Sequence, residues 1–167
     1  MISIVLWGIV YVSTFIFMEF VAWFSHKYIM HGFLWSWHQD HHKKDHNSWF
    51  EMNDLFFIVY ALLSAGFVVL WGELGFWPGL PIALGIFTYG MTYFLVHDIF
   101  IHQRFKLFRK TNNRYAKGIR RAHKIHHKNI HKEKGECFGM LFVPRKYWTE
   151  AKRSMELKRN RQKPAQS

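Results

Sequence analysis

The pattern of apolar and polar positions divides the chain into three long apolar runs and two polar parts. The runs cover Met1–Phe24, Leu55–Gly72 and Leu74–Val96. At ~1.5 Å per helical residue, the first run reaches about 36 Å and the third about 34 Å, which exceeds the ~30 Å core of a bilayer. The middle run, at about 27 Å, is marginal. The sequence predicts an all-α integral membrane bundle of three transmembrane helices, or four.

The connections between the runs are also readable. Gly72-Glu73 forms a short polar break, so we expect the second and third runs to form a hairpin. Pro78 and Pro81 lie early in the third run, where a helix tolerates proline better than in its interior. The first run has no preceding basic stretch and no small-residue cleavage site, so we expect a retained membrane helix and not a secretory signal.

Basic residues predict the orientation of this bundle. The 23 Lys and Arg residues comprise Lys27, Lys43 and Lys44 in the first polar part, and otherwise lie from Arg104 onward. The positive-inside rule places residues 25–53 and the part after residue 97 in the cytoplasm, with the N-terminus outside. The net charge of +12 is explained by contact with anionic lipid, and we do not expect nucleic-acid binding. The basic surface could also dock an acidic electron-transfer partner, and the sequence leaves this open.

Histidines carry the candidate chemistry. Ten of the twelve form two matching sets, each reading H-x4-H followed by H-x2-H-H. The first set is His26, His31, His38, His41 and His42, and the second is His97, His102, His123, His126 and His127. Imidazole is the commonest neutral metal ligand. Because positions i, i+3 and i+4 share a helix face, we expect the three rings of each triplet to converge on one point. Ten such ligands are enough for two metal ions.

The two histidines of each H-x4-H pair can bind the same metal ion only under a further condition. His26 and His31 are about 140° apart around an ideal helix, so they share a face only if the helix ends or distorts between them. Gly32 marks a stop that would allow this. Beside the triplets we interpret both pairs as ligands. His46 and His131 each lie four residues beyond a triplet, and we leave their roles open.

Acidic residues are candidates to orient these ligands, because a ligating histidine usually donates its other ring N–H to a carboxylate or carbonyl. The nearby acids are Glu19, Asp40, Asp45, Glu51, Asp54 and Asp98. Glu19 is the only charge in the first apolar run and lies two turns before His26 on nearly the same face. We expect Glu19 and Asp98 to support the ligands; alternatively, Glu19 lies near enough to the helix end to reach water. We predict no catalytic residues beyond the metal ligands.

The ligand type limits the chemistry. Cys137 is the only cysteine, which excludes an intramolecular disulfide and a cysteine-based zinc or iron–sulfur site. Ten histidines exceed the four ligands of a structural zinc ion, and all-nitrogen ligation argues against haem. Iron with open coordination positions activates oxygen. Beside apolar helices the natural substrate is lipid-soluble, and the spacing alone does not choose between hydroxylation and desaturation.

The histidine sets resemble the membrane di-iron hydroxylase and desaturase superfamily, and the surrounding residues resemble its bacterial beta-carotene 3-hydroxylases. The stretches that carry the resemblance are Met18-Glu19, His26-Lys-Tyr-Ile-Met-His31-Gly32, Leu34-Trp-Ser-Trp-His38-Gln-Asp-His41-His42, Phe50-Glu-Met-Asn53-Asp54, His97-Asp98-Ile-Phe-Ile-His102-Gln-Arg104, Arg121-Ala-His123-Lys-Ile-His126-His127 and Phe138-Gly139-Met140-Leu-Phe-Val-Pro144. They span residues 18 to 145, most of the chain.

The resemblance implies two non-haem iron ions bound by the ten histidines, which zinc could replace in a purified sample. It implies O2 as co-substrate, a reduced ferredoxin-type donor, and hydroxylation of beta-carotene at carbon 3 of each ring, through beta-cryptoxanthin to zeaxanthin. It places the protein in the bacterial inner (cytoplasmic) membrane. We expect one membrane-embedded domain over residues 1–145, with a cytoplasmic histidine-rich helical cap, and a basic tail over 146–167 that frays from Lys152 onward.

Two rival functions remain open from the sequence. A fatty-acid or sterol hydroxylase or desaturase fits the histidine pattern equally, although the W-x-W-H and F-E-x-N-D stretches favour a carotenoid substrate. A membrane metal-binding or transport protein is disfavoured, because transport needs ligands in the middle of the membrane helices. The histidines of this chain gather at one face of the bilayer instead.

Overall fold

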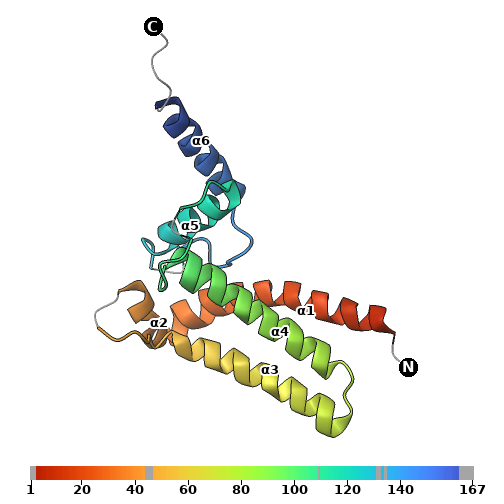
Figure 1. Cartoon of the computed structure of the whole chain (residues 1–167). Helices are drawn as coiled ribbons and strands as arrows, with labels where there is room; N and C mark the ends of the chain where they lie inside the picture. The colour runs from red at the N-terminus through yellow and green to blue at the C-terminus, as the bar shows by residue number, and fades with distance from the viewer. Residues whose placement is uncertain (1–2, 44–46, 109, 131–132, 134, 162–167) are drawn as a thin grey trace.

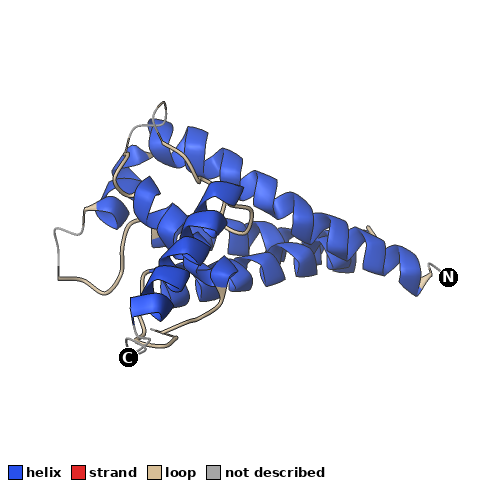
Figure 2. Cartoon of the chain, turned by 90° about the horizontal axis from the view of Figure 1, so that it is seen from above, coloured by secondary structure: helices blue, strands red, loops and turns tan. Residues whose placement is uncertain are grey.

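The computed structural model describes residues 3–43, 47–108, 110–130, 133 and 135–161, which form helices and loops without a strand. The helices are α1 (Ile4–Phe24), η1 (Ser25–Phe33), α2 (Trp35–His42), α3 (Asp54–Leu74), α4 (Gly79–Tyr93), η2 (Phe94–Ile101), α5 (Arg114–His126) and α6 (Arg145–Arg161). Three long helices lie side by side, and α2, α5 and α6 gather at the end opposite the N-terminus (Figures 1 and 2). The expected all-α bundle with a histidine-rich helical cap is confirmed; the side of the membrane on which the cap lies stays a prediction.

Three helices in the described residues are long and apolar enough to cross a membrane. They span Ile4–Phe33, Asp54–Leu74 and Gly79–Ile101, with mean hydropathies of 2.0, 2.2 and 1.5. Their outward faces carry large exposed apolar side chains such as Ile16 and Leu62, as lipid contact requires. The middle span is longer than its apolar run and reaches about 32 Å, so it is no longer marginal.

The predicted hairpin of α3 and α4 forms around a tight turn. Gly75 ends α3 in the left-handed conformation with φ 62°, which glycine adopts without steric cost. Pro78 caps α4, so this helix begins at Gly79 and not at Leu74, where the apolar run starts. Between the two helices, the buried Ser64 hydroxyl donates to the carbonyl oxygen of Ala83 at 2.9 Å.

Two π-helical segments, η1 and η2, continue α1 and α4 and bring residues five apart onto one face. The His102 N–H donates to the carbonyl oxygen of His97 at 2.9 Å, an i→i+5 bond. Consequently the rings of His97 and His102 lie 4.6 Å apart, and those of His26 and His31 lie 5.1 Å apart. This is the helix distortion that the H-x4-H spacing required. Gly32 then leaves helical geometry (φ −113°, ψ −123°) before α2 begins.

The basic segment after residue 145 is helical, so the expected fraying from Lys152 is wrong for the residues up to Arg161. Helix α6 packs on α5 through Tyr147, which lies in a buried apolar cluster with Ile119 and Ala122 of α5. Tyr147 and Ala151 are 2% and 4% exposed. These two side chains lie one turn apart and give α6 one apolar face, which its overall charge conceals. Residues 162–167 lie outside the described residues.

Candidate metal centre

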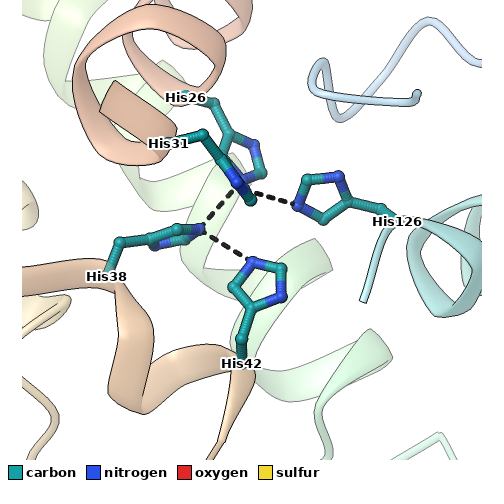
Figure 3. A group of neighbouring side chains, drawn as sticks. All are labelled: His26, His31, His38, His42 and His126. Atoms are coloured by element: carbon teal, nitrogen blue, oxygen red, sulfur yellow. Dashed lines mark hydrogen bonds between the residues drawn. The ribbon is translucent and has the colours of Figure 1, made fainter. Parts of the chain in front are cut away.

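Histidine side chains from four helices, η1, α2, η2 and α5, meet where the long helices adjoin the cap. Two groups form, and within each group the candidate ligand atoms lie within 4.8 Å of one another. The first group contains His26, His31, His38, His42 and His126 (Figure 3), and the second contains His41, His97, His102 and His123. Nine of the ten predicted histidines therefore have the geometry to hold a metal ion. His46 and His131 lie outside the described residues.

The expectation that each H-x2-H-H triplet converges on one point is wrong. Helix α2 contributes His38 and His42 to the first group and His41 to the second. Helix α5 is divided in the same way, with His126 in the first group and His123 in the second. Both helices pass between the two groups. Histidines three residues apart on the same helix therefore point to different groups.

His127, the tenth predicted ligand, contacts both groups and belongs to neither. Its ring stacks on that of His42 at a centroid distance of 4.3 Å. Its Nε2 lies 2.8 Å from Nε2 of His123. It is therefore placed at the junction of the two centres.

Ring protonation indicates that the first group is arranged for a cation. Nδ1 of His31 donates to the carbonyl oxygen of Ile130 at 2.8 Å, and Nδ1 of His126 donates to that of Glu136 at 3.2 Å. A neutral imidazole carries one N–H, so Nε2 of both rings is unprotonated. These two Nε2 atoms lie 3.1 Å apart. Two lone pairs at that distance repel each other unless a cation accepts both.

The same arrangement recurs on the other side of this group. Nδ1 of His26 donates to the carbonyl oxygen of Phe138 at 2.9 Å, and Nδ1 of His38 donates to Oδ1 of Asn53 at 2.6 Å. The remaining Nε2 atoms of His26 and His38 lie 3.1 Å apart. Each ring is held through one nitrogen, which leaves the other aimed at the centre.

In the second group, the groups beside the ring Nδ1 atoms are carboxylates and not backbone carbonyls. Nδ1 of His41 lies 2.9 Å from Glu51 Oε2, and Nδ1 of His97 lies 3.2 Å from Asp98 Oδ2. Nε2 of His41 and Nε2 of His97 are buried without a hydrogen-bond partner among the described residues. A buried unpaired nitrogen is costly, and a metal ion would satisfy both.

The electrostatic surroundings keep the rings of the two H-x2-H-H triplets neutral, which is the state that binds metal. Burial, and then the neighbouring histidines, lower the pKa of His42 and His123 far below the ordinary 6.5. Burial lowers the pKa of His126 to about 3 and that of His127 to about 4, and charge on neighbouring histidines adds to the effect. The donor set thus fits a nitrogen-preferring transition-metal ion.

An arginine joins the carboxylates around the second group. The guanidinium of Arg104 lies 3.2 Å from Glu51, 2.9 Å from Asp54 and 3.3 Å from Asp98. The sequence indicated Asp98 as a supporting residue, and it does contact the His97 ring. Arg104 was missed as a supporting residue, although it stands two positions after His102, because nothing in sequence spacing shows which acids a cation joins.

Glu19 supports the site indirectly. Its hydrogen bonds go to backbone N–H groups and to a tyrosine, not to a histidine ring. Its Oε1 accepts the backbone N–H groups of residues 140–142 at 2.9, 2.8 and 3.0 Å, and its Oε2 accepts the Tyr89 hydroxyl at 2.7 Å. Phe138, whose carbonyl oxygen accepts the ring N–H of His26, lies two residues before this segment. The alternative of an acid reaching water does not hold, since Glu19 is 7% exposed.

Asn53 and the backbone carbonyls that orient the first group were not foreseen. Asn53 lies in the F-E-x-N-D stretch that carried part of the resemblance, so a signal for it existed. The carbonyls of Phe138, Ile130 and Glu136 had none, because every residue has a carbonyl and only the folded chain shows which ones reach a ring.

The sequence is similar to a known protein family and to several named proteins. The fatty acid hydroxylase family matches residues 11–145. The chain is 43% identical to a beta-carotene hydroxylase of Pantoea ananas over 78% of this chain and 74% of that protein. It is 37% identical to a beta-carotene hydroxylase of Pseudescherichia vulneris over 81% and 76% of the two chains. A chloroplastic beta-carotene 3-hydroxylase of Arabidopsis thaliana is 37% identical over 77% of this chain and 42% of its own length. No solved structure matches.

Proposed function

This chain belongs to the fatty acid hydroxylase family, and we propose that it is a membrane di-iron monooxygenase that hydroxylates carbon 3 of the rings of beta-carotene. Two histidine groups at one end of three apolar helices carry the proposal. Relatives named beta-carotene hydroxylases at up to 43% identity support the substrate. Residues 1–145 would form the hydroxylase domain, which agrees with the extent of the family match.

In this proposal the protein holds the metal ions, orients their ligands and shields the centre from water. The first group and the second group would each hold one iron ion, with His127 at the junction as the fifth ligand of the second. Iron in such sites supplies the activation of O2 for insertion into a C–H bond. The carbonyls, Asn53, Glu51 and Asp98 fix one nitrogen of each ring, so the ligands are preorganised. Burial of the rings, with His38 and His97 2% exposed and His126 fully buried, limits the access of water to the candidate centres.

The overall balance requires an electron donor. The C–H bond at carbon 3 becomes C–OH with one oxygen atom of O2, and the other oxygen atom leaves as water. Two electrons and two protons must therefore enter for each hydroxyl group. We infer that a ferredoxin-type protein delivers the electrons, and that the cap faces the cytoplasm of a bacterial inner membrane, as the basic residues beside the helices predict.

Expression in cells that accumulate beta-carotene tests the proposal. The wild-type chain should yield beta-cryptoxanthin and zeaxanthin, while His126→Ala, which removes a first-group ring, should yield neither and should carry less iron. His46→Ala is the matched control, because this histidine is not in the proposed ligand set, and it should keep most of the activity. Unchanged beta-carotene with iron-loaded wild-type protein and a supplied donor would refute the substrate and favour a fatty acid or a sterol.

A further inference from the structure

A cavity of about 430 Å³ lies among α1, α3, α4 and the segment that precedes α3. Its lining is apolar or aromatic apart from four residues, Asn53, Asp54, Asp98 and Arg104. The volume falls in the range of small-molecule sites, which is about 300–1,000 Å³. The cavity therefore has the size and the surface of a site for an apolar ligand.

The polar end of the cavity lies against the histidine groups. Asn53, on this wall, accepts the ring N–H of His38 from the first group, and Asp98 does so for His97 of the second. Tyr93 also lines this end, and its ring lies 4.8 Å from the His97 ring. Among the described residues no histidine lines the cavity itself, so Asn53, Asp98 and Tyr93 separate a molecule in it from the two candidate metal centres by one layer of side chains.

The other end of the cavity opens toward lipid. Phe57 on α3 and Met91 on α4 line it and are 48% and 38% exposed, and both helices are membrane spans. Gly90 lies between them. A β-carbon at Gly90 would have the Phe57 Cε2 atom, at 3.8 Å, as its one neighbour within 4 Å. The missing side chain at Gly90 leaves room at this wall between α3 and α4.

We propose that this cavity binds one ring-bearing end of a carotenoid, which enters sideways from the bilayer between α3 and α4 past Gly90 and stops at Tyr93. This assignment rests on the proposed function. An apolar lining suits a ring without polar groups, and a lateral mouth lets the rest of an elongated molecule remain in the lipid. A mouth that opened to water would instead expose the apolar surface of the bound molecule to water, which is unfavourable.

The test fills the cavity at Gly90 and compares a matched glycine. Gly90→Leu adds a side chain where one ring atom is the nearest obstacle, so the helix should form normally. Gly66→Leu makes the same change on the exposed face of α3, where a β-carbon meets nothing within 4 Å and no cavity is lined. Gly90→Ala gives an intermediate size. Each protein is purified from beta-carotene-accumulating cells, and its iron content, co-purified beta-carotene and hydroxylated products are measured.

Gly90→Leu should bind and hydroxylate at least tenfold less beta-carotene at unchanged iron content, Gly90→Ala should lie between it and wild type, and Gly66→Leu should stay within twofold of wild type. Bound carotenoid, summed over beta-carotene and its hydroxylated products, that is equal in Gly90→Leu and Gly66→Leu would overturn the cavity assignment. No bound carotenoid of either kind in wild type would overturn it as well. Loss of co-purified phospholipid alone would identify a lipid chain as the occupant and overturn it too. Absence of products from the wild type, in contrast, would refute the proposed function.

Discussion

Replacing Glu19 by alanine should detach the segment that holds His26 and release metal, although Glu19 touches no metal-binding ring. Its carboxylate accepts three backbone N–H groups from residues 140–142 and the Tyr89 hydroxyl. A buried donor left without a partner costs about 1–3 kcal/mol, so three of them cost about 3–9 kcal/mol. A typical fold is stabilised by only about 5–15 kcal/mol. We therefore expect residues 140–142 to leave the bundle and form hydrogen bonds with water, because leaving their N–H groups buried and unpaired would cost much of that stability.

The consequence for the site follows from Phe138, which lies two residues before this segment and accepts the N–H of His26 at 2.9 Å. Loss of such an orienting partner typically lowers metal affinity about 10–100-fold. Glu19→Gln should behave differently, because its amide oxygen can accept the same three N–H groups and its NH2 can donate to the Tyr89 oxygen. Hydrogen bonds to a neutral acceptor are about half as strong as those to a charged one, so this variant should be weakened but metal-loaded.

The assay is the thermal midpoint in detergent together with iron per protein chain. Glu73→Ala is the matched control, since it removes an exposed acid at the other end of the bundle, near the α3–α4 turn. We expect the order wild type, Glu73→Ala, Glu19→Gln and Glu19→Ala in both measurements, with the first two nearly equal. Iron content and midpoint of Glu19→Ala equal to those of Glu73→Ala would show that these four hydrogen bonds do not hold the site.

Three further predictions concern the groups around the rings. Asn53→Leu removes the acceptor of the His38 N–H, so metal affinity should fall about 10–100-fold while Asn53→Asp retains it, as measured by competition with a chelator. Arg104→Ala leaves three carboxylates without their shared cation and should lower iron content more than Arg104→Lys; equal iron in the two variants would contradict the role of the bidentate guanidinium. Acid should destabilise the fold, because burial lowers the pKa of His126 to about 3 and that of His127 to about 4, whereas the pKa of a histidine in the unfolded chain is about 6.5. The unfolded chain then binds more protons below pH 6.5, so stability should be complete above that value and fall toward pH 4 in a pH-dependent melting series.

Several elements of the fold were readable from the sequence because they depend on local patterns. Apolar length predicted three membrane helices, or four, and three are found among the described residues. The α3–α4 hairpin was also predicted, but its break was placed at Gly72-Glu73, which lies inside α3, whereas the turn runs from Gly75 to Pro78. The H-x4-H spacing even required a distorted helix, which η1 and η2 supply. Helix α6 was missed because few of its residues are apolar. Tyr147 and Ala151 are buried, but the many charged residues around them hide the apolar pattern in the sequence.

What the sequence by itself indicated is the chemistry of the candidate centre: a set of ten histidines, nine of which the structure gathers into two groups, no cysteine in that set, and a position beside apolar helices. Only the tertiary structure decided how these ligands are shared. Helices α2 and α5 pass between two centres, so His41 and His42 are adjacent in the chain yet serve different groups. The cause is that spacing fixes the direction of a side chain around its own helix axis, whereas the target of that side chain depends on how separate helices pack against one another.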